Sequence, residues 1–268
     1  MVDRNDNSQT AMGNEMQQTI RTAITLLAFA LTALVPPAVA SELTILSGGA
    51  AKAGLSDAVP LYEKASGSKA TVEYLPMGPL LKALSEGRAP DIVVVTEDVL
   101  PDVRAKGFIM AGSETEIGRV GIGVCVHETA KAPDISTPES LKATLLAAKS
   151  IVYIDPKIGT SGRHLAEVFR KLGILEVIDA KTKLGTGGYI TEPVGRGEIE
   201  IGLHQISEIL PVQGVKLVGP LPPELQKVTV YVGAISAQAK DPEGARKFLA
   251  HMRTPEVRAA FVSRGFMP

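Results

Sequence analysis

Short apolar strands alternate with amphipathic helices along the first part of the chain. The segments 43–46, 70–74 and 92–95 have the pattern of strands, and the last is apolar on both faces, as in the middle of a parallel sheet. Apolar residues at helical spacing predict one helix from residue 52 through Tyr62 and another from Leu80 to near Gly87. This alternation predicts a doubly wound α/β layer.

The alternation of strands and helices repeats in the second part of the chain. Strands are predicted at 118–126, 151–154 and 200–203, and a helix with apolar residues at i, i+3, i+4 and i+7 opens at Arg163. A long strand at 228–235 precedes helices within 241–262. The sequence therefore predicts a second α/β lobe.

Two of these strands, 118–126 and 228–235, are long enough to cross between lobes. We therefore expect an α/β protein with two doubly wound lobes joined by two crossing strands. The first lobe is expected to comprise residues 41–120 and 234–268, and the second lobe residues 121–233.

The first forty residues follow a different pattern. The uncharged apolar run 22–34 is too short to span a bilayer comfortably, and small residues at Ala38 and Ala40 form a signal-peptidase site. We predict a signal peptide cleaved after Ala40, hence a periplasmic protein, with an N-terminal anchor helix as the alternative. Acidic residues before Arg21 are unusual for a signal peptide and favour a translation start at Met16 over Met1.

Charge and composition exclude several function classes. The chain has 28 Lys and Arg against 29 Asp and Glu, and the predicted signal segment removes two Arg and three acidic residues, so the rest is neutral. Neutrality argues against a protein that binds nucleic acid by neutralising phosphates. The absence of Trp argues against a stacked-ring platform for sugars or bases.

Metal and thiol chemistry have little support in the sequence. The four histidines show no ligand spacing with carboxylates or thiols, so no metal site is expected. Cys125, the only cysteine, lies in an apolar run and is interpreted as a small buried hydrophobe, with a reactive thiol as the alternative.

Four turns rich in Gly, Ser and Thr are candidates for a binding site, at residues 47–51, 76–79, 159–162 and 185–188. The carboxyl ends of strands form the ligand crevice of open α/β sheets, and free amides at helix starts favour anions. Thr160-Ser161-Gly162 is the strongest candidate, with simple helix capping as the alternative. The turns predict an anion site built from hydroxyls and backbone dipoles.

A catalytic interpretation rests on Ser161 and His164, a hydroxyl and a base three residues apart at a helix start. The surrounding Gly159-Thr-Ser-Gly-Arg163 lacks the Gly-x-Ser-x-Gly elbow, and Gly185–Gly188 lacks the dinucleotide-binding spacing. We therefore expect no enzymatic activity and no cofactor, with a hydrolase using Ser161 and His164 as the alternative.

Several blocks resemble a known family, namely residues 43–50, 81–92, 197–208 and the closing segment from Asp241 to Phe266. Over residues 41–268 the chain is similar to the type II periplasmic solute-binding proteins of ABC transporters, particularly the molybdate-binding branch. The resemblance implies a monomeric receptor that captures a small anion, an oxyanion or organic acid, and passes it to an inner-membrane permease. A soluble sensor for a membrane signalling partner is the alternative.

The resemblance also implies site residues. In the molybdate-binding branch the anion is held by two Ser, a Tyr and backbone amides, and the matching positions here are Ala50, Met77 and Gln205, of which only Gln205 has a side-chain donor. Molybdate is therefore not expected. Lys52 and Arg163 lie near two turns and are candidates for a carboxylate, although Lys52 is interpreted as solvated helix surface. The expected ligand-binding residues are Ser47, Gly48, Gly49, Ala50, Met77, Gly78, Thr160, Ser161, Gly162, Arg163, Gly187 and Gln205.

Overall fold

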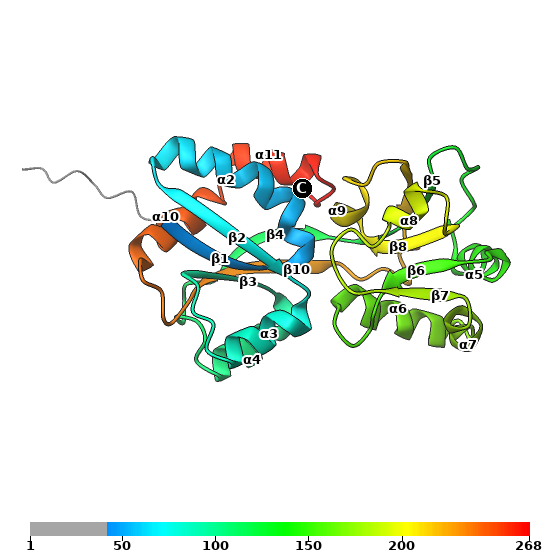
Figure 1. Cartoon of the computed structure of the whole chain (residues 1–268), viewed down its shortest axis with the longest axis horizontal. Coiled ribbons are helices and arrows are strands. Elements are labelled where there is room, and N and C mark those ends of the chain that lie inside the picture. Colours follow the sequence, from blue (N-terminus) through cyan, green and yellow to red (C-terminus); the bar gives the residue numbers. More distant parts are fainter. Residues whose placement is uncertain (1–41) are drawn as a thin grey trace, which may run out of the picture. The chain divides into compact units, whose positions relative to one another are not determined.

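A computed structural model describes residues 42–268 (Figure 1). The predicted signal peptide, its cleavage after Ala40 and the choice between Met1 and Met16 lie outside the described residues. Within 42–268, no helix has the length and apolar character needed to cross a bilayer.

The described chain alternates strands and helices, as the hydrophobic pattern predicts. The first part contains β1 (Glu42–Gly48), η1 (Gly49–Ala51), α2 (Lys52–Ser66), β2 (Lys69–Leu75), α3 (Met77–Ser85), β3 (Ile92–Thr96), η2 (Glu97–Val99), α4 (Leu100–Ala105) and β4 (Thr115–Val120). The middle part contains β5 (Ile122–His127), α5 (Pro138–Ala147), β6 (Ile151–Ile154), α6 (Thr160–Lys171), α7 (Leu175–Asp179), β7 (Thr182–Gly185), α8 (Glu192–Gly195), β8 (Ile201–Gln205), α9 (Ile206–Ile209) and β9 (Val215–Pro220). The last part contains β10 (Thr229–Ile235), α10 (Pro242–His251) and α11 (Pro255–Ser263).

These strands form two five-stranded mixed sheets. The first has the order β2-β1-β3-β10-β4, with β10 antiparallel to both of its neighbours. The second has the order β7-β6-β8-β5-β9, with β5 antiparallel to both of its neighbours. We call each sheet with its helices a lobe. The arrangement confirms the predicted α/β class with two lobes.

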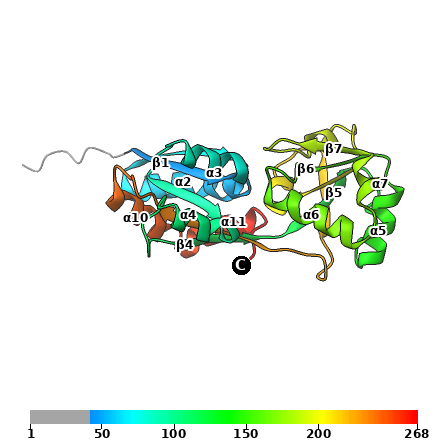
Figure 2. The ribbon, with the colours of Figure 1, turned by 90° about the horizontal axis from the view of Figure 1, so that it is seen from below.

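The chain crosses between the lobes twice, at Gly121 and through residues 221–228 (Figure 2). The predicted strand 118–126 is therefore two strands, because β4 ends in the first sheet at Val120 and β5 starts in the second at Ile122. The returning strand β10 pairs with β3 and β4 from Thr229 onward, earlier than the predicted boundary at residue 234. The apolar run predicts this strand but does not reveal which sheet it joins.

The side chain of Gln226 links the two crossing segments by hydrogen bonds. Its Oε1 accepts from the Ile122 amide at 2.9 Å, and its Nε2 donates to the Ile122 carbonyl at 2.8 Å. A Cβ on Gly121 would lie 3.1 Å from this amide nitrogen, so a side chain there would crowd the contact. The crossings therefore lie side by side, held by one side chain.

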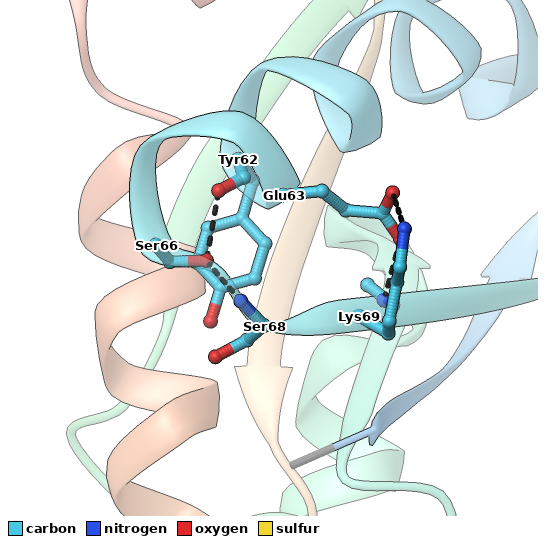
Figure 3. A network of polar contacts seen from close by, with 6 residues as sticks. Tyr62, Glu63, Ser66, Ser68 and Lys69 are labelled. Carbon is cyan, nitrogen blue, oxygen red and sulfur yellow. Dashed lines mark hydrogen bonds and ion pairs between the residues drawn. The ribbon is translucent and has the colours of Figure 1, made fainter. Parts of the chain in front are cut away.

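The turn that leads from α2 into β2 is closed by side chains (Figure 3). Ser66 Oγ donates to the Tyr62 carbonyl at 2.8 Å and accepts from the Ser68 amide at 3.1 Å. Glu63 accepts from the Ala70 amide and pairs with Lys69, and these contacts lower the pKa of the Glu63 carboxyl. The turn fixes the start of β2, whose far end brings Tyr74 to the cavity described below.

The sole cysteine is buried, as predicted. Cys125 lies in β5 with no solvent exposure, and burial raises the pKa of its thiol to about 12. At neutral pH the thiol is therefore protonated and packs as a small apolar side chain.

Candidate functional site

A cavity of about 140 Å³ lies between the two lobes. An apolar cavity of about 150 Å³ binds benzene, so this space is of a size that admits a small molecule. The first lobe contributes Gly49, Ala50, Lys52, Tyr74, Leu75, Pro76, Met77 and Tyr231 to the lining. The second lobe contributes Ile154, Gly159, Thr160, Ser161, Gly187, Gly188, Tyr189, His204, Gln205 and Glu208.

The predicted site residues divide between the lining and its surroundings. Those that line the cavity are Gly49, Ala50, Met77, Thr160, Ser161, Gly187 and Gln205. Ser47, Gly48, Gly78, Gly162 and Arg163 do not line it. The turns that the sequence singles out thus meet at one place, but only some of their residues face the cavity.

The residues outside the lining have other contacts. Ser47 is buried and donates to the Gly48 carbonyl at 3.1 Å, and the Gly78 amide donates across the lobes to the Ile158 carbonyl at 3.0 Å. Arg163 lies 3.7 Å from Asp98, also across the lobes, with both side chains about two-fifths exposed. Gly78 and Arg163 therefore make contacts between the lobes.

Two glycines near the cavity are places where structural elements approach closely. A Cβ on Gly48 would lie 2.9 Å from both Met77 and the Tyr231 ring, and a Cβ on Gly162 would overlap the Ile154 carbonyl oxygen. These glycines let η1 and the start of α6 lie close to their neighbours. They therefore help to position the residues that line the cavity, although they do not line it themselves.

Lys52 supplies positive charge to the cavity. Among the described residues that line it, Lys52 is the only lysine or arginine. Its Nζ lies 4.8 Å from the ring centroid of Tyr189 in the second lobe and 5.9 Å from that of Tyr74 in the first. The interpretation of Lys52 as solvated helix surface is wrong, because Lys52 is half-buried and lines the cavity beside two aromatic rings. The local sequence does not indicate this contact, since the rings come from segments far away in the sequence.

Three tyrosines add neutral donors. Burial raises the pKa of Tyr74 to about 12. Burial, followed by repulsion from the Glu208 carboxylate, raises the pKa of Tyr189 and of Tyr231. All three phenols therefore keep their protons at neutral pH and are available to donate hydrogen bonds.

A chain of buried polar side chains forms part of the second-lobe wall. Ser161 Oγ lies 3.3 Å from His204 Nδ1, and His204 Nε2 lies 3.0 Å from Glu208 Oε2. The three side chains come from the start of α6, the end of β8 and α9, and their residues are 3%, 1% and 6% exposed. His204 Nε2 is an ion-pair contact of Glu208 but makes no well-directed hydrogen bond within the described residues.

The alternative pairing of Ser161 with His164 is not formed. His164 Nε2 lies 2.7 Å from the Leu225 carbonyl, in the second crossing segment, and Ser161 instead contacts His204. Short sequence spacing favours His164, whereas His204 reaches Ser161 only through the fold. The available sequence signal is that His204 lies near the carboxyl end of a buried strand, where ligand residues of α/β sheets gather.

Gln205 has its donor engaged. The side-chain Nε2 donates to Thr229 Oγ1 at 2.9 Å, and both residues are buried. Its Oε1 has no hydrogen-bond partner within the described residues. The expectation that Gln205 offers its amide to an anion therefore does not match this arrangement, in which the amide supports β10.

Within residues 42–268, no group of three or more His, Cys, Asp or Glu side chains is arranged to hold a metal ion. The cavity is lined by Lys52, by Tyr, Thr and Ser hydroxyl groups, and by the His204–Glu208 pair.

Two α/β lobes with two crossings and a cavity between them define the class of two-lobed solute-binding folds. The solved structure of the Azotobacter vinelandii periplasmic molybdate-binding protein matches with a TM-score of 0.72 at 15% identity, over 84% of this chain and 99% of that one. This match confirms the predicted type II periplasmic binding protein fold.

Sequence comparisons are more specific. The chain is 30% identical over 252 residues to an aconitate isomerase of a Pseudomonas species, covering 92% of this chain and 95% of that protein. It is 22% identical over 258 residues to the molybdate-binding protein of Rhodobacter capsulatus, covering 94% and 98%.

A family model for bacterial extracellular solute-binding proteins matches residues 43–267. The chain belongs to this family. Membership confirms the predicted resemblance and the predicted role in solute binding.

Proposed function

We propose that the chain is exported to the periplasm, where its cleft captures a small organic acid and passes it to an inner-membrane ABC permease. The observation that carries this proposal is the position of Lys52, the only Lys or Arg on the described lining, in a cavity that also presents the Thr160 and Ser161 hydroxyls. A carboxylate matches this set, since it carries one negative charge and accepts several hydrogen bonds.

The lining favours an organic acid over a tetrahedral oxyanion. Ala50 and Met77 stand where the molybdate-binding branch has serine donors, and both present apolar surface to the cavity. Apolar lining with a few polar groups suits a ligand that has both a carbon skeleton and carboxylates.

A ligand bound here contacts both lobes. Lys52 and Tyr74 belong to the first lobe, while Thr160, Ser161 and Tyr189 belong to the second. A ligand that bridges them stabilises the closed arrangement by contacts that an open one lacks, so capture is coupled to hinge closure at the two crossings.

Export rests on residues 1–40, whose apolar run and Ala38-Val-Ala40 sequence fit a cleaved signal peptide. We further propose that the mature chain acts as a monomer and does not bind nucleic acid, since its formal charge is balanced.

A thermal-shift screen of the mature protein tests the proposal. The panel comprises succinate, citrate, tricarballylate, cis-aconitate and trans-aconitate, against molybdate, tungstate and sulfate. A ligand at 100 times its dissociation constant adds about 2.7 kcal/mol of stability, which gives a clear rise in melting temperature. We expect the rise with one or more carboxylates. A rise with molybdate or tungstate alone would overturn the choice of an organic acid.

A second candidate function is isomerisation of the bound acid. It is favoured by the 30% identity to an aconitate isomerase together with the buried contact of His204 and Glu208 in the cavity wall. The direct test is to incubate the mature protein with trans-aconitate and to follow the cis isomer by NMR. A constant isomer ratio would contradict this second candidate function and would not affect the proposed receptor function.

A further inference from the structure

We propose that Glu208, supported by His204 and Ser161, is the acid–base group of an allylic proton shift that isomerises an unsaturated polycarboxylate in the cleft. The proposal rests on the proposed binding of a carboxylate and adds a reaction to it. The substrate class is an acid in which a methylene group lies between a carboxylate and a carbon–carbon double bond.

Glu208 faces the cavity from the second lobe and reaches the first. A Cβ built on Gly49 would lie 3.1 Å from Glu208 Oε1, so the carboxylate approaches the η1 turn where that turn has no side chain. Both residues line the cavity. A ligand seated between the lobes therefore lies against this carboxylate.

The environment of Glu208 is that of an acid–base group rather than of a structural ion pair. A buried carboxylate requires a compensating charge or a proton, and His204 at 3.0 Å is its only ion-pair contact within the described residues. A pair that served structure alone would be expected to satisfy every polar atom, yet His204 Nε2 lacks a hydrogen bond while lining the cavity. A buried ring nitrogen that lies 3.0 Å from a carboxylate without a well-directed hydrogen bond, at the wall of a cavity, points to a ligand or to proton transfer.

The reaction balances without a cofactor. The Glu208 carboxylate takes a proton from the methylene carbon, and the electron pair of that C–H bond spreads over three carbons and into the adjacent carboxylate. The proton then returns to the far carbon of the former double bond, so one C–H bond breaks, another forms and the double bond moves by one position. Nothing is oxidised or reduced.

The rest of the cavity matches the charge that develops. Lys52 and the neutral phenols of Tyr74, Tyr189 and Tyr231 line the same cavity, and there they can hold the carboxylates of such an acid and oppose the negative charge of the intermediate. His204 is a positioning residue that lies 3.0 Å from the Glu208 carboxylate, and Ser161 contacts the imidazole from the other side.

The test compares wild type, Glu208→Gln and the control Glu176→Gln, which changes an exposed glutamate on α7. Calorimetry measures the Kd of trans-aconitate, and NMR measures its conversion to the cis isomer. We expect wild type and Glu176→Gln to interconvert the isomers at equal rates. In Glu208→Gln the rate should fall roughly 100-fold or more, while the Kd changes only a few-fold.

The possible outcomes separate the two proposals. Binding without interconversion by wild type would overturn the proton shift and leave the receptor function intact, whereas absence of binding would overturn the receptor function itself. If the isomerisation rate of Glu208→Gln lies within about threefold of the wild-type rate, Glu208 is not the base.

Two further measurements keep the test decisive if Glu208→Gln does not fold. With an acid deuterated at the methylene carbon, isomerisation by wild type should remove the label from that carbon, to the far carbon or to solvent, and label that stays on its original carbon would refute the mechanism. His204→Gln should shift the pH profile of kcat, which a merely structural histidine would not do, and an unchanged profile would remove His204 from the assignment.

Discussion

At the scale of single residues, the fold contains a buried acid whose role is structural. Asp91 is 2% exposed, and its Oδ2 accepts from the Thr44 amide and hydroxyl at 2.9 and 2.8 Å. Its Oδ1 accepts from the amides of Lys240 and Asp241 at 2.7 and 3.1 Å. Asp91 is thus satisfied on every side, in contrast with the His204–Glu208 pair at the cavity.

We predict that Asp91→Asn lowers the free energy of unfolding by about 2–3 kcal/mol at pH 7, because an NH2 group would replace one oxygen that accepts two hydrogen bonds. Asp102→Asn, at an exposed position on α4, is the matched control and should change stability little. Urea unfolding measures both. Equal stability of the two variants would contradict the structural role of Asp91.

The same residue predicts a pH dependence. Burial raises the pKa of Asp91, but the hydrogen bonds from Thr44, Asp241 and Lys240 outweigh it, so the pKa in the folded state lies below its ordinary value. The stabilisation is therefore fully present above the unfolded-state pKa of about 3.9 and is lost as the pH falls through the folded-state pKa. The stability gap between wild type and Asp91→Asn should stay constant near neutrality and shrink only below about pH 4.

Single residues of the site were predictable only where local sequence decides their position. Thr160 and Ser161 stand out because they open a helix after a glycine, and both line the cavity. Lys52 and His204 are placed by contacts with Tyr189 and Ser161 from distant segments, which no local pattern encodes. Glu208 lies in a block that carries the family resemblance, but its burial against His204 depends on the fold.

At the scale of elements, apolar patterning predicts the central strands and misses both edge strands of the second sheet. The strands β3, β6 and β8 are buried throughout, so their composition alone identifies them. The edge strands β7 and β9 are only partly buried and lack a continuous apolar run. Their partners in the sheet, rather than their own residues, define them as strands.

The close approach of α6 to β6 leads to a prediction for Gly162. An alanine Cβ there would overlap the Ile154 carbonyl oxygen, so Gly162→Ala must push the start of α6 away from the strand. We expect a loss of about 1–3 kcal/mol in stability and weaker ligand binding, because Thr160 and Ser161 move with the helix. Thermal melts and calorimetry measure the two effects.

Gly219→Ala in β9 is the matched control, because its Cβ would meet only Ile135 at 3.8 Å, an ordinary contact. It should leave both stability and binding almost unchanged. Full ligand affinity in Gly162→Ala would show that the placement of α6 does not govern the site.

At the scale of the whole described chain, two crossings and a few direct contacts link the lobes around the cavity. Besides the Gly78 amide, the Ser207 hydroxyl donates across the lobes to the Ala50 carbonyl at 2.8 Å. The crossings are held by Gln226, and His164 contacts the Leu225 carbonyl beside it. The alternation of strands and helices predicts two lobes, but which surfaces meet depends on these tertiary contacts.

The central claim is that the cleft closes on a small organic carboxylate held by Lys52. Calorimetric titration of trans-aconitate into wild type, Lys52→Gln and the control Lys64→Gln tests it most directly, since Lys64 is exposed on the same helix α2. Loss of a charge-assisted contact worth about 1.5–3 kcal/mol should weaken binding by roughly 10- to 100-fold in Lys52→Gln, with Lys64→Gln unchanged. Equal affinities for all three proteins, or no binding by wild type, would contradict the account.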